Sequence, residues 1–513
     1  MIRLDGRTLT PEAVERVAYG GEKVTLAPEA IARMNRSRRV VERILSKGET
    51  VYGITTGFGV LKDVKIKPDE TRELQRNLVR SHAAGVGDLV QEEVSRAAVL
   101  LRANALATGH SGVRPVIVTR LLNLLNQCQV PVVPAQGSVG ASGDLAPLSH
   151  LALVLIGEGY VWKNGKPTPA GPALKAAGIK PIELQAKEGL ALINGTQLMT
   201  AYGALIAARA RRLVLMADAI GAASLEALKG TDVAFRADLQ AARGHWGQMA
   251  SAANLRKLLA GSTIRASHVD CDKVQDAYSL RCMPQVHGAV RDAVSYARGA
   301  VTIELNAATD NPLIFDTRGG EVVSGGNFHG HPISLAMDIV AIALTGLANI
   351  SERRVERLVN PALSGLPAFL IRGGGGVKAG LHSGFMIAQY TAAALVSESK
   401  ALSHPASVDS IPTSANQEDF VSMGPIAARK AWQILHNAER VLAIEWLCAA
   451  QGIEFHRPLR AGKAVEAAIR TLRKAVPALG ADRILAPDLE KAAALIREGE
   501  LLMAMQAAGL RLE

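Results

Sequence analysis

Apolar residues recur at helical spacing along most of the chain. Between residues 92 and 107, Val94, Ala98, Leu101 and Ala105 fall on one face of a helix. Similar patterns predict helices over residues 30–46, 68–81, 116–127, 197–229, 285–307, 333–358, 383–402 and 424–451. Mostly apolar helices longer than about 20 residues must bury their sides against one another. We therefore expect a mainly α protein built around a central bundle of long helices.

The remaining pattern divides the chain into three expected regions. Residues 1–195 mix helices, short extended pieces and loops, which predicts a smaller N-terminal helical and loop region. Residues 196–460 hold the long-helix bundle. Inside it, residues 312–326 predict a β-hairpin that turns at Gly319-Gly320. Residues 461–513 predict a charged tail of two helices around a proline-rich break.

Composition and charge narrow the class of protein. Only 4% of the 513 residues are aromatic. The net charge is +11, but the sequence contains no long basic block, and this spread of charge argues against nucleic-acid binding. The four cysteines, at positions 128, 271, 282 and 448, show no zinc-site spacing. No apolar signal-peptide core follows Met1, and the apolar stretch from Ile333 to Ile350 contains Asp338. A cytoplasmic enzyme without a membrane span is the expected class.

One loop of small residues, GSVGASGDLAP at 137–147, offers unusual chemistry. It lacks the lysine of a phosphate-binding loop and the Gly-x-Ser-x-Gly spacing of a nucleophile elbow, so its plainest interpretation is a flexible turn. However, Gly143 has no Cβ, so its nitrogen can approach the carbonyl carbon of Ala141 closely. If that nitrogen attacks, a five-membered ring closes, and Ser142 can lose its hydroxyl as water to leave an exocyclic methylene.

This loop resembles the self-cyclising triad of the aromatic amino acid ammonia-lyases. Seven further stretches resemble the same family in the same order: YGITTGFG (52–59), SHAAGVG (81–87), INGTQ (193–197), QDAYSLRC (275–282), TDNPLI (309–314), GGNFHG (325–330) and SVDSIPTSANQED (407–419). The resemblance implies that Ala141-Ser142-Gly143 becomes a methylidene-imidazolone group, with no added cofactor. It also implies a homotetramer whose active sites combine residues of more than one subunit.

The resemblance also assigns roles that single residues would not reveal. A loop tyrosine usually packs, but Tyr52 is by resemblance the base that removes the β-proton. Asn194 could simply cap the following helix, but by resemblance its amide holds the oxygen of the electrophile. By resemblance Arg281 binds the substrate carboxylate. Gln275 and Tyr278 line the electrophile and the proton path, and Phe328 packs against the electrophile.

Two positions bear on the substrate. Ser81-His82 resembles the family members that deaminate histidine, although a lone histidine at a helix end is more often structural. Glu418 suits an imidazole N–H, whereas a phenyl ring would leave this carboxylate unpaired. The expected reaction is therefore the conversion of L-histidine to trans-urocanate and ammonia. Phe420 and His331 depart from that pattern, because histidine lyases commonly have His and Glu or Gln there.

Two alternatives stay open on sequence grounds, and a metal centre is disfavoured. A sister lyase or aminomutase acting on tyrosine or phenylalanine would use the same triad. A non-catalytic, basic helical scaffold would leave the triad unmodified. A metal centre at His329 and His331 lacks a third ligand at a recognisable spacing. The glycine run 373–376 lacks the lysine of a phosphate-binding loop, so we interpret it as a flexible turn.

Overall fold

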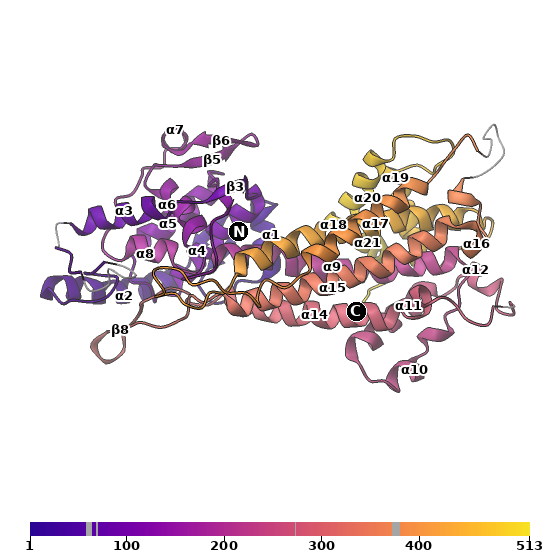
Figure 1. Ribbon diagram of the computed structural model, residues 1–513, viewed down its shortest axis with the longest axis horizontal. Coiled ribbons are helices and arrows are strands. Elements are labelled where there is room, and N and C mark those ends of the chain that lie inside the picture. The colour runs from indigo at the N-terminus through magenta and orange to yellow at the C-terminus, as the bar shows by residue number, and fades with distance from the viewer. Residues whose placement is uncertain (58–63, 68–69, 272, 372–379) are drawn as a thin grey trace. The chain divides into compact units, whose positions relative to one another are not determined.

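The computed structural model describes residues 1–57, 64–67, 70–271, 273–371 and 380–513. Within these ranges the chain forms 21 α-helices and eight strands (Figure 1). The strands are three or four residues long and pair into four two-stranded sheets, so almost all of the order is helical. The mainly α class expected from the sequence is confirmed.

The chain divides into two compact units. The first comprises residues 1–208, 297–338 and 405–429, and the second comprises residues 209–296, 339–404 and 430–513. The four longest helices contribute residues to both units: α9 (Gln197–Ala227), α14 (Met283–Glu304), α15 (His331–Val359) and α18 (Gly424–Glu454).

The first unit holds eight shorter helices and all eight described strands. The helices are α1 (Pro11–Ala18), α2 (Pro28–Lys47), α3 (Thr71–His82), α4 (Glu92–Ala107), α5 (Pro115–Asn126), α6 (Leu145–Leu155), α7 (Ala170–Ala176) and α8 (Glu188–Ile193). The strands are β1 (Ile2–Leu4), β2 (Val24–Leu26), β3 (Val86–Leu89), β4 (Pro134–Gln136), β5 (Tyr160–Lys163), β6 (Lys166–Pro169), β7 (Leu313–Phe315) and β8 (Glu321–Val323). β1 and β2 are parallel, and the other three pairs are antiparallel.

Helices α3, α6 and α8 pack against one another in the first unit (Figure 1). α6 is apolar on almost every side, and most of its residues are buried. α8 is buried throughout and ends at Ile193. This packing places the ends of the three helices, with His82, Leu145 and Asn194, around one cavity.

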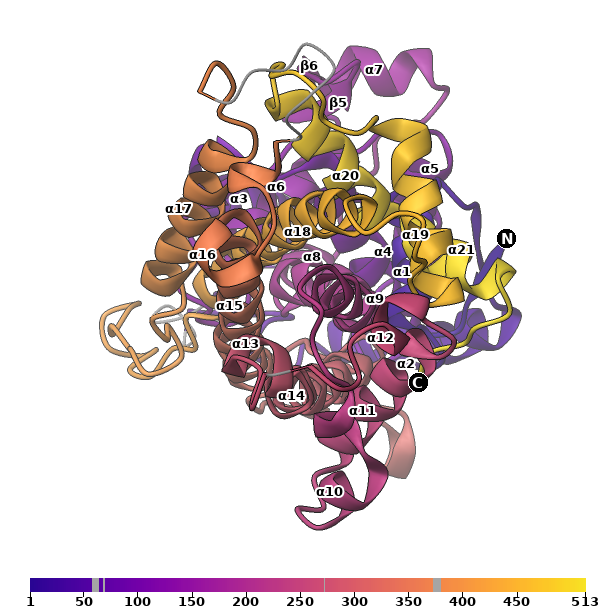
Figure 2. The same ribbon diagram turned by 90° about the vertical axis from the view of Figure 1, so that its right-hand side faces the viewer.

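The second unit contains nine further helices: α10 (Ala237–Ala241), α11 (Trp246–Leu259), α12 (Thr263–Ala266), α13 (Tyr278–Arg281), α16 (Pro361–Ser364), α17 (Met386–Leu402), α19 (Lys463–Ala475), α20 (Ala486–Glu498) and α21 (Glu500–Ala507). Helices α19, α20 and α21 lie side by side (Figure 2). The tail therefore contains three helices, because Gly499 takes a left-handed φ of 78° and separates α20 from α21.

Buried polar pairs join the long helices within the second unit. Glu445 on α18 accepts hydrogen bonds from Ser351 at 2.6 Å and from Arg354 at 2.5 Å, both on α15. Asp218 on α9 contacts His287 on α14 at 2.9 Å. Burial lowers the pKa of His287, which favours its neutral form. Such pairs satisfy polar groups that would otherwise be buried without partners.

Most helix positions agree with the periodicity of the sequence. The prediction for 92–107 coincides with α4, and the hairpin at 312–326 is present as β7 and β8. The periodicity missed α1, α6, α11 and the short helices α7, α8, α10, α12, α13 and α16. α6 is too uniformly apolar to show an amphipathic period. The predicted helix start at 68–69, the end of the 51–59 loop and the glycine run 373–376 lie outside the described residues.

Among the described helices, α15 alone is long and apolar enough to cross a membrane. Two thirds (67%) of its most apolar window is buried inside the protein. Core helices of soluble proteins pass the same test of length and composition, so the burial favours a core helix.

Candidate active site

The loop that carries Ala141, Ser142 and Gly143 is held in a tight turn. Ser142 and Gly143 have left-handed φ values of 48° and 75°. The amide of Asp144 donates to the carbonyl oxygen of Gly195 at 2.7 Å, and the amide of Gly195 donates to the carbonyl oxygen of Ser142 at 3.3 Å. A Cβ on Gly143 would lie 2.1 Å from the carbonyl oxygen of Gly195. Only glycine therefore fits at position 143 in this conformation.

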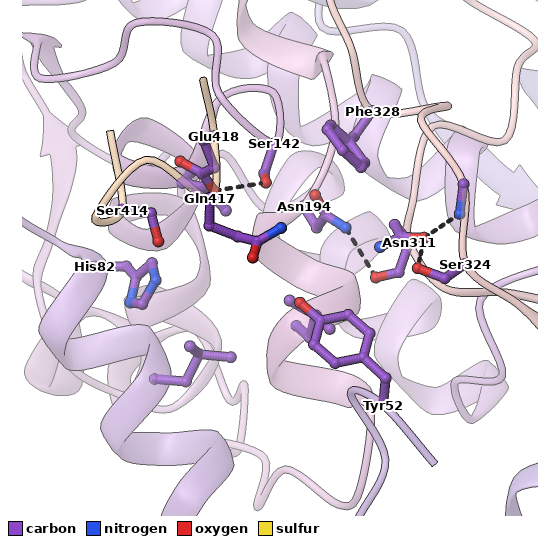
Figure 3. Close-up of a pocket in the computed structure, with 14 residues that line it drawn as sticks. Tyr52, His82, Ser142, Asn194, Asn311, Ser324, Phe328, Ser414, Gln417 and Glu418 are labelled. Atoms are coloured by element: carbon purple, nitrogen blue, oxygen red, sulfur yellow. Dashed lines mark hydrogen bonds between the residues drawn. The ribbon is translucent and has the colours of Figure 1, made fainter. Parts of the chain in front are cut away.

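The loop lines a cavity of about 500 Å³ in the first unit (Figure 3). It is lined by Tyr52, Leu78, His82, Ser142, Leu145, Leu190, Asn194, Asn311, Ser324, Gly325, Phe328, Ser414, Gln417 and Glu418. Six candidates from the sequence therefore meet in one place: Tyr52, His82, Ser142, Asn194, Phe328 and Glu418. Among these described lining residues there is no lysine or arginine.

Glu418 contacts the hydroxyl of Ser142. The Oγ of Ser142 donates to Oε1 of Glu418 at 3.1 Å, and Oγ1 of Thr413 donates to Oε2 at 2.8 Å. Between Thr413 and Glu418, Ser414, Ala415 and Asn416 all adopt left-handed φ values, of 52°, 52° and 65°. Non-glycine residues rarely adopt this conformation, and it persists where surrounding contacts enforce it. The turn directs Glu418 to Ser142.

His82 ends α3 and lines the cavity. Burial lowers the pKa of its imidazole, which therefore stays neutral at pH 7. Its Nδ1 lies 3.1 Å from Oγ of Ser81. A neutral imidazole offers one donor and one acceptor, so His82 can either donate a hydrogen bond to a second imidazole or accept one from it.

Tyr52 follows Val51 in a turn that ends at Thr56, ahead of the undescribed residues 58–63. Gly53 has a φ of 74°, and a Cβ there would lie 2.9 Å from Leu190 and 3.0 Å from Pro312. This close packing fixes the backbone next to Tyr52. In Figure 3 the ring of Tyr52 lies across the cavity from Glu418.

Asn194 lines the cavity, but its nitrogen is already engaged. Nδ2 donates to Oδ1 of Asp310 at 3.3 Å and to the carbonyl oxygen of Asn311 at 2.9 Å. Oδ1 of Asn194 has no hydrogen-bond partner among the described residues, although the residue is only 3% exposed. The contact to the Ser142 carbonyl oxygen comes instead from the backbone amide of Gly195.

Four charged side chains are buried in the region around Asn194: Arg102, Asp144, Lys187 and Asp310. Nζ of Lys187 and Oδ2 of Asp310 form an ion pair at 2.6 Å, and Arg102 donates to the carbonyl oxygen of Asn194 at 2.7 Å. Burial lowers the pKa of Arg102 to about 10 and raises that of Asp144 to about 7. Oδ2 of Asp144 accepts from the amides of Leu198 and Met199 in the first turn of α9, at 2.8 and 3.0 Å.

Sequence reasoning singled out none of these four charges for a role. Arg102 directly follows the apolar run of residues 97–101 in α4, and a charge at the end of that run was the available signal. Lys187 and Asp310 are 123 positions apart, and no periodic pattern connects them.

Gln275, Tyr278 and Arg281 belong to the second unit and are not among the residues that line this cavity. The guanidinium of Arg281 lies 4.7 Å from the centre of the Tyr278 ring. Tyr278 is 71% exposed.

His331 and Phe420, the two residues that depart from the pattern of the histidine lyases, contact each other. The rings of His331 and Phe420 lie 6.2 Å apart, and His329 stacks on Phe420 at 5.9 Å with 9° between the ring planes. Neither His331 nor Phe420 lines the cavity. Across the described residues, no group of three His, Cys, Asp or Glu side chains could hold a metal ion.

The fold and this loop define a class of protein. The family model for aromatic amino acid lyases matches residues 9–474. The chain belongs to the aromatic amino acid lyase family. A histidine ammonia-lyase from Koribacter versatilis is 54% identical, covering 98% of this chain and 99% of the relative.

Solved structures agree with this assignment. The histidine ammonia-lyase of Trypanosoma cruzi superposes with a TM-score of 0.91 at 46% identity, over 99% of this chain and 95% of that one. The tyrosine aminomutase of Streptomyces globisporus superposes with a TM-score of 0.94 at 43% identity, over the whole of both chains.

Proposed function

We propose that the protein deaminates L-histidine to trans-urocanate and ammonia without oxidation. The observation that carries the proposal is the meeting of Ser142, Glu418, His82 and Tyr52 in one cavity. Histidine ammonia-lyases that match the chain over nearly its full length support the same substrate. The chain is thus a carbon–nitrogen lyase, and the non-catalytic scaffold is set aside.

We also propose that Ala141-Ser142-Gly143 matures into a methylidene-imidazolone group. The left-handed turn and the absence of room for a Cβ at Gly143 fit that group. When formed, the group supplies an electrophile that makes the substrate nitrogen a better leaving group. The backbone amide of Gly195 would hold the oxygen of this group, a role supported by its hydrogen bond to the Ser142 carbonyl oxygen.

The other side chains bind and orient the substrate. We assign Glu418 and neutral His82 to the two nitrogens of the imidazole ring, since one nitrogen donates and the other accepts. The hydroxyl oxygen of Tyr52 is the proposed base for the β-proton. Phe328 covers the side of the cavity near Ser142 and helps to exclude water (Figure 3).

A homotetramer in the cytoplasm completes the proposal. The described residues lining the cavity provide no cation for the substrate carboxylate, and we assign that role to Arg281 of a second copy, with Gln275 and Tyr278 beside it. Several helical side chains are exposed although apolar, including Ile303, Ile342, Ile387 and Tyr390. Exposed apolar groups of this kind are typical of subunit interfaces.

Mixing two inactive variants tests the shared site. Tyr52→Phe and Arg281→Ala should each abolish most turnover alone. When the two chains are co-expressed, some sites would combine an intact Tyr52 with an intact Arg281, and part of the activity should return. If purified mixed oligomers stay inactive, or if the active protein is monomeric in sizing experiments, the shared site is wrong.

The central experiment combines intact mass with turnover. The mature protein should be lighter than its sequence by two waters, and histidine should give urocanate absorbance faster than tyrosine or phenylalanine gives its product. Ser142→Ala should keep the fold, lose turnover by several orders of magnitude and not lose the two waters. Near-normal turnover of Ser142→Ala would refute the electrophile.

Tyrosine deamination or isomerisation is the second candidate. The close superposition on a tyrosine aminomutase favours it, but Glu418 argues against it because a phenol ring would leave this carboxylate without its imidazole donor. A higher kcat/KM for tyrosine than for histidine would select this alternative.

A further inference from the structure

The orientation of the Asn194 carboxamide is fixed by its neighbours. Its two N–H groups face two acceptors, the carboxylate of Asp310 and the carbonyl oxygen of Asn311. A flipped carboxamide would point its oxygen at these two acceptors, which is electrostatically unfavourable. The flipped orientation is therefore excluded by the contacts, and Oδ1 must face the other way.

Asp310 cannot turn away from Asn194, because its remaining contacts are also fixed. Oδ2 pairs with the buried ammonium of Lys187, and Oδ1 also accepts from the amide of Asn311 at 2.7 Å. The carboxylate and ammonium are both almost fully buried, at 1% and 0% exposed. Breaking such a pair leaves an uncompensated charge in a low-dielectric interior. Lys187 and Asp310 thus set which atom of Asn194 faces the cavity.

The atom that faces the cavity, Oδ1 of Asn194, is an acceptor without a donor among the described residues. Figure 3 shows the carbonyl oxygen of Asn194 pointing away from Asn311, toward the side of the cavity where Ser142 and Phe328 lie. A buried acceptor without a partner is rare and costly, so a bound ligand is expected to supply the missing hydrogen.

The chemistry of an amino acid substrate leaves one group for this position. Its carboxylate carries acceptors only and would be repelled by Oδ1. Its imidazole N–H is assigned to Glu418 or His82 under the proposed function. The α-amino group is the remaining donor, and it must lie next to Ser142, where the proposed electrophile receives it.

We infer that Oδ1 of Asn194 accepts a hydrogen bond from the α-amino group of the substrate, and that Asp310 and Lys187 are positioning residues for this contact. The inference rests on the proposed function for the placement of the amine. It differs from the role expected from the family resemblance, in which the amide of Asn194 donates to the electrophile's oxygen.

Paired ligands give the test. Ser142→Ala protein binds without turnover, so calorimetry can compare L-histidine with 3-(imidazol-4-yl)propanoate, which lacks only the amino group. Adding Asn194→Ala should weaken histidine binding about ten- to hundredfold, the usual effect of one hydrogen bond to a charged group. Binding of the propanoate should change less than about threefold.

Two other outcomes would overturn the inference. An equal loss for both ligands would place Asn194 on the carboxylate or the ring. Unchanged binding of both ligands would restrict Asn194 to the electrophile. Ser324→Ala is the matched control, because Ser324 also lines the cavity and bonds Asn311, at 3.2 Å, yet should not separate the two ligands.

Asp310→Asn tests the positioning role and replaces Asn194→Ala if that variant does not fold. An amide at 310 can donate to Asn194 and allow its carboxamide to flip, so the same selective loss of histidine binding is expected. A purely structural role for Asp310 would weaken both ligands alike. A wrong substrate can be told apart from a wrong role of Asn194. If the substrate is tyrosine, the same comparison can be made with tyrosine and 3-(4-hydroxyphenyl)propanoate.

Discussion

Replacing Gly143 by alanine tests the geometry on which ring closure depends. The added Cβ would lie 2.1 Å from the oxygen, 2.4 Å from the carbonyl carbon and 2.9 Å from the Cα of Gly195. These are backbone atoms, so one of the two segments must move. That movement breaks the contact between Asp144 and Gly195 at 2.7 Å and the contact between Gly195 and Ser142 at 3.3 Å.

The expected magnitude follows from these losses. A left-handed φ costs alanine about 1–2 kcal/mol relative to glycine. Each lost backbone hydrogen bond adds about 0.5–1.5 kcal/mol. Gly143→Ala should therefore destabilise the protein by about 2–5 kcal/mol, and the nitrogen of residue 143 should no longer reach Ala141.

Gly165→Ala provides the matched control. Gly165 lies in the turn between β5 and β6 with a φ of 72°, close to that of Gly143, and a Cβ there would meet nothing within 4 Å. Only the conformational cost of about 1–2 kcal/mol should remain. The difference between the two variants isolates the steric contact with Gly195.

The assays are urea unfolding and intact mass. Gly143→Ala should unfold at clearly lower urea than Gly165→Ala and should keep the mass of the unmodified chain, whereas Gly165→Ala should still lose two waters. The reasoning is refuted if both variants are equally stable and both lose two waters.

Three further outcomes follow from the buried charges and from Glu418. Glu418→Ala should lower kcat/KM for histidine by ten- to a hundredfold or more, while its intact mass still shows the loss of two waters; a normal histidine rate would remove Glu418 from substrate binding. Lys187→Met should destabilise the protein by about 3–5 kcal/mol in urea unfolding, since it removes one partner of a buried ion pair, and adding Asp310→Asn should restore part of that loss, which a simple cavity would not allow. Burial lowers the pKa of the His436 imidazole from 6.5 to about 4 in the folded protein. As the pH falls from 6.5 toward 4, the unfolded chain binds a proton here that the folded protein does not, so the free energy of unfolding falls by about 3 kcal/mol. His436→Gln should flatten this fall in stability between pH 7 and 4.5.

Helix periodicity predicted most of the fold because the long helices bury whole faces. The 31-residue α9 and α18 were both expected within a few residues of their ends. α6 was missed since its apolar residues surround the helix and carry no period of 3.6. The resemblance of short motifs assigned Tyr52 and Glu418 to the active site, and both line one cavity although hundreds of positions separate them.

The side-chain network around Asn194 could not be predicted in the same way. Its orientation depends on Asp310 and Lys187, whose partners are set by tertiary packing rather than by local sequence. The resemblance suggested that the amide of Asn194 holds the electrophile's oxygen, and this remains a prediction. In the structure the Ser142 carbonyl oxygen accepts a hydrogen bond from the backbone amide of Gly195, which no side-chain motif reveals.

The hydrogen bond between Ser142 and Glu418 has a consequence for the order of events after synthesis. In the newly folded chain both oxygens of Glu418 are satisfied, one by Ser142 and the other by Thr413. Maturation as proposed removes the Ser142 hydroxyl and leaves Oε1 in need of a donor. Affinity for the imidazole ring would then arise at the same step as chemical competence. Immature chains would not sequester histidine that they are unable to convert.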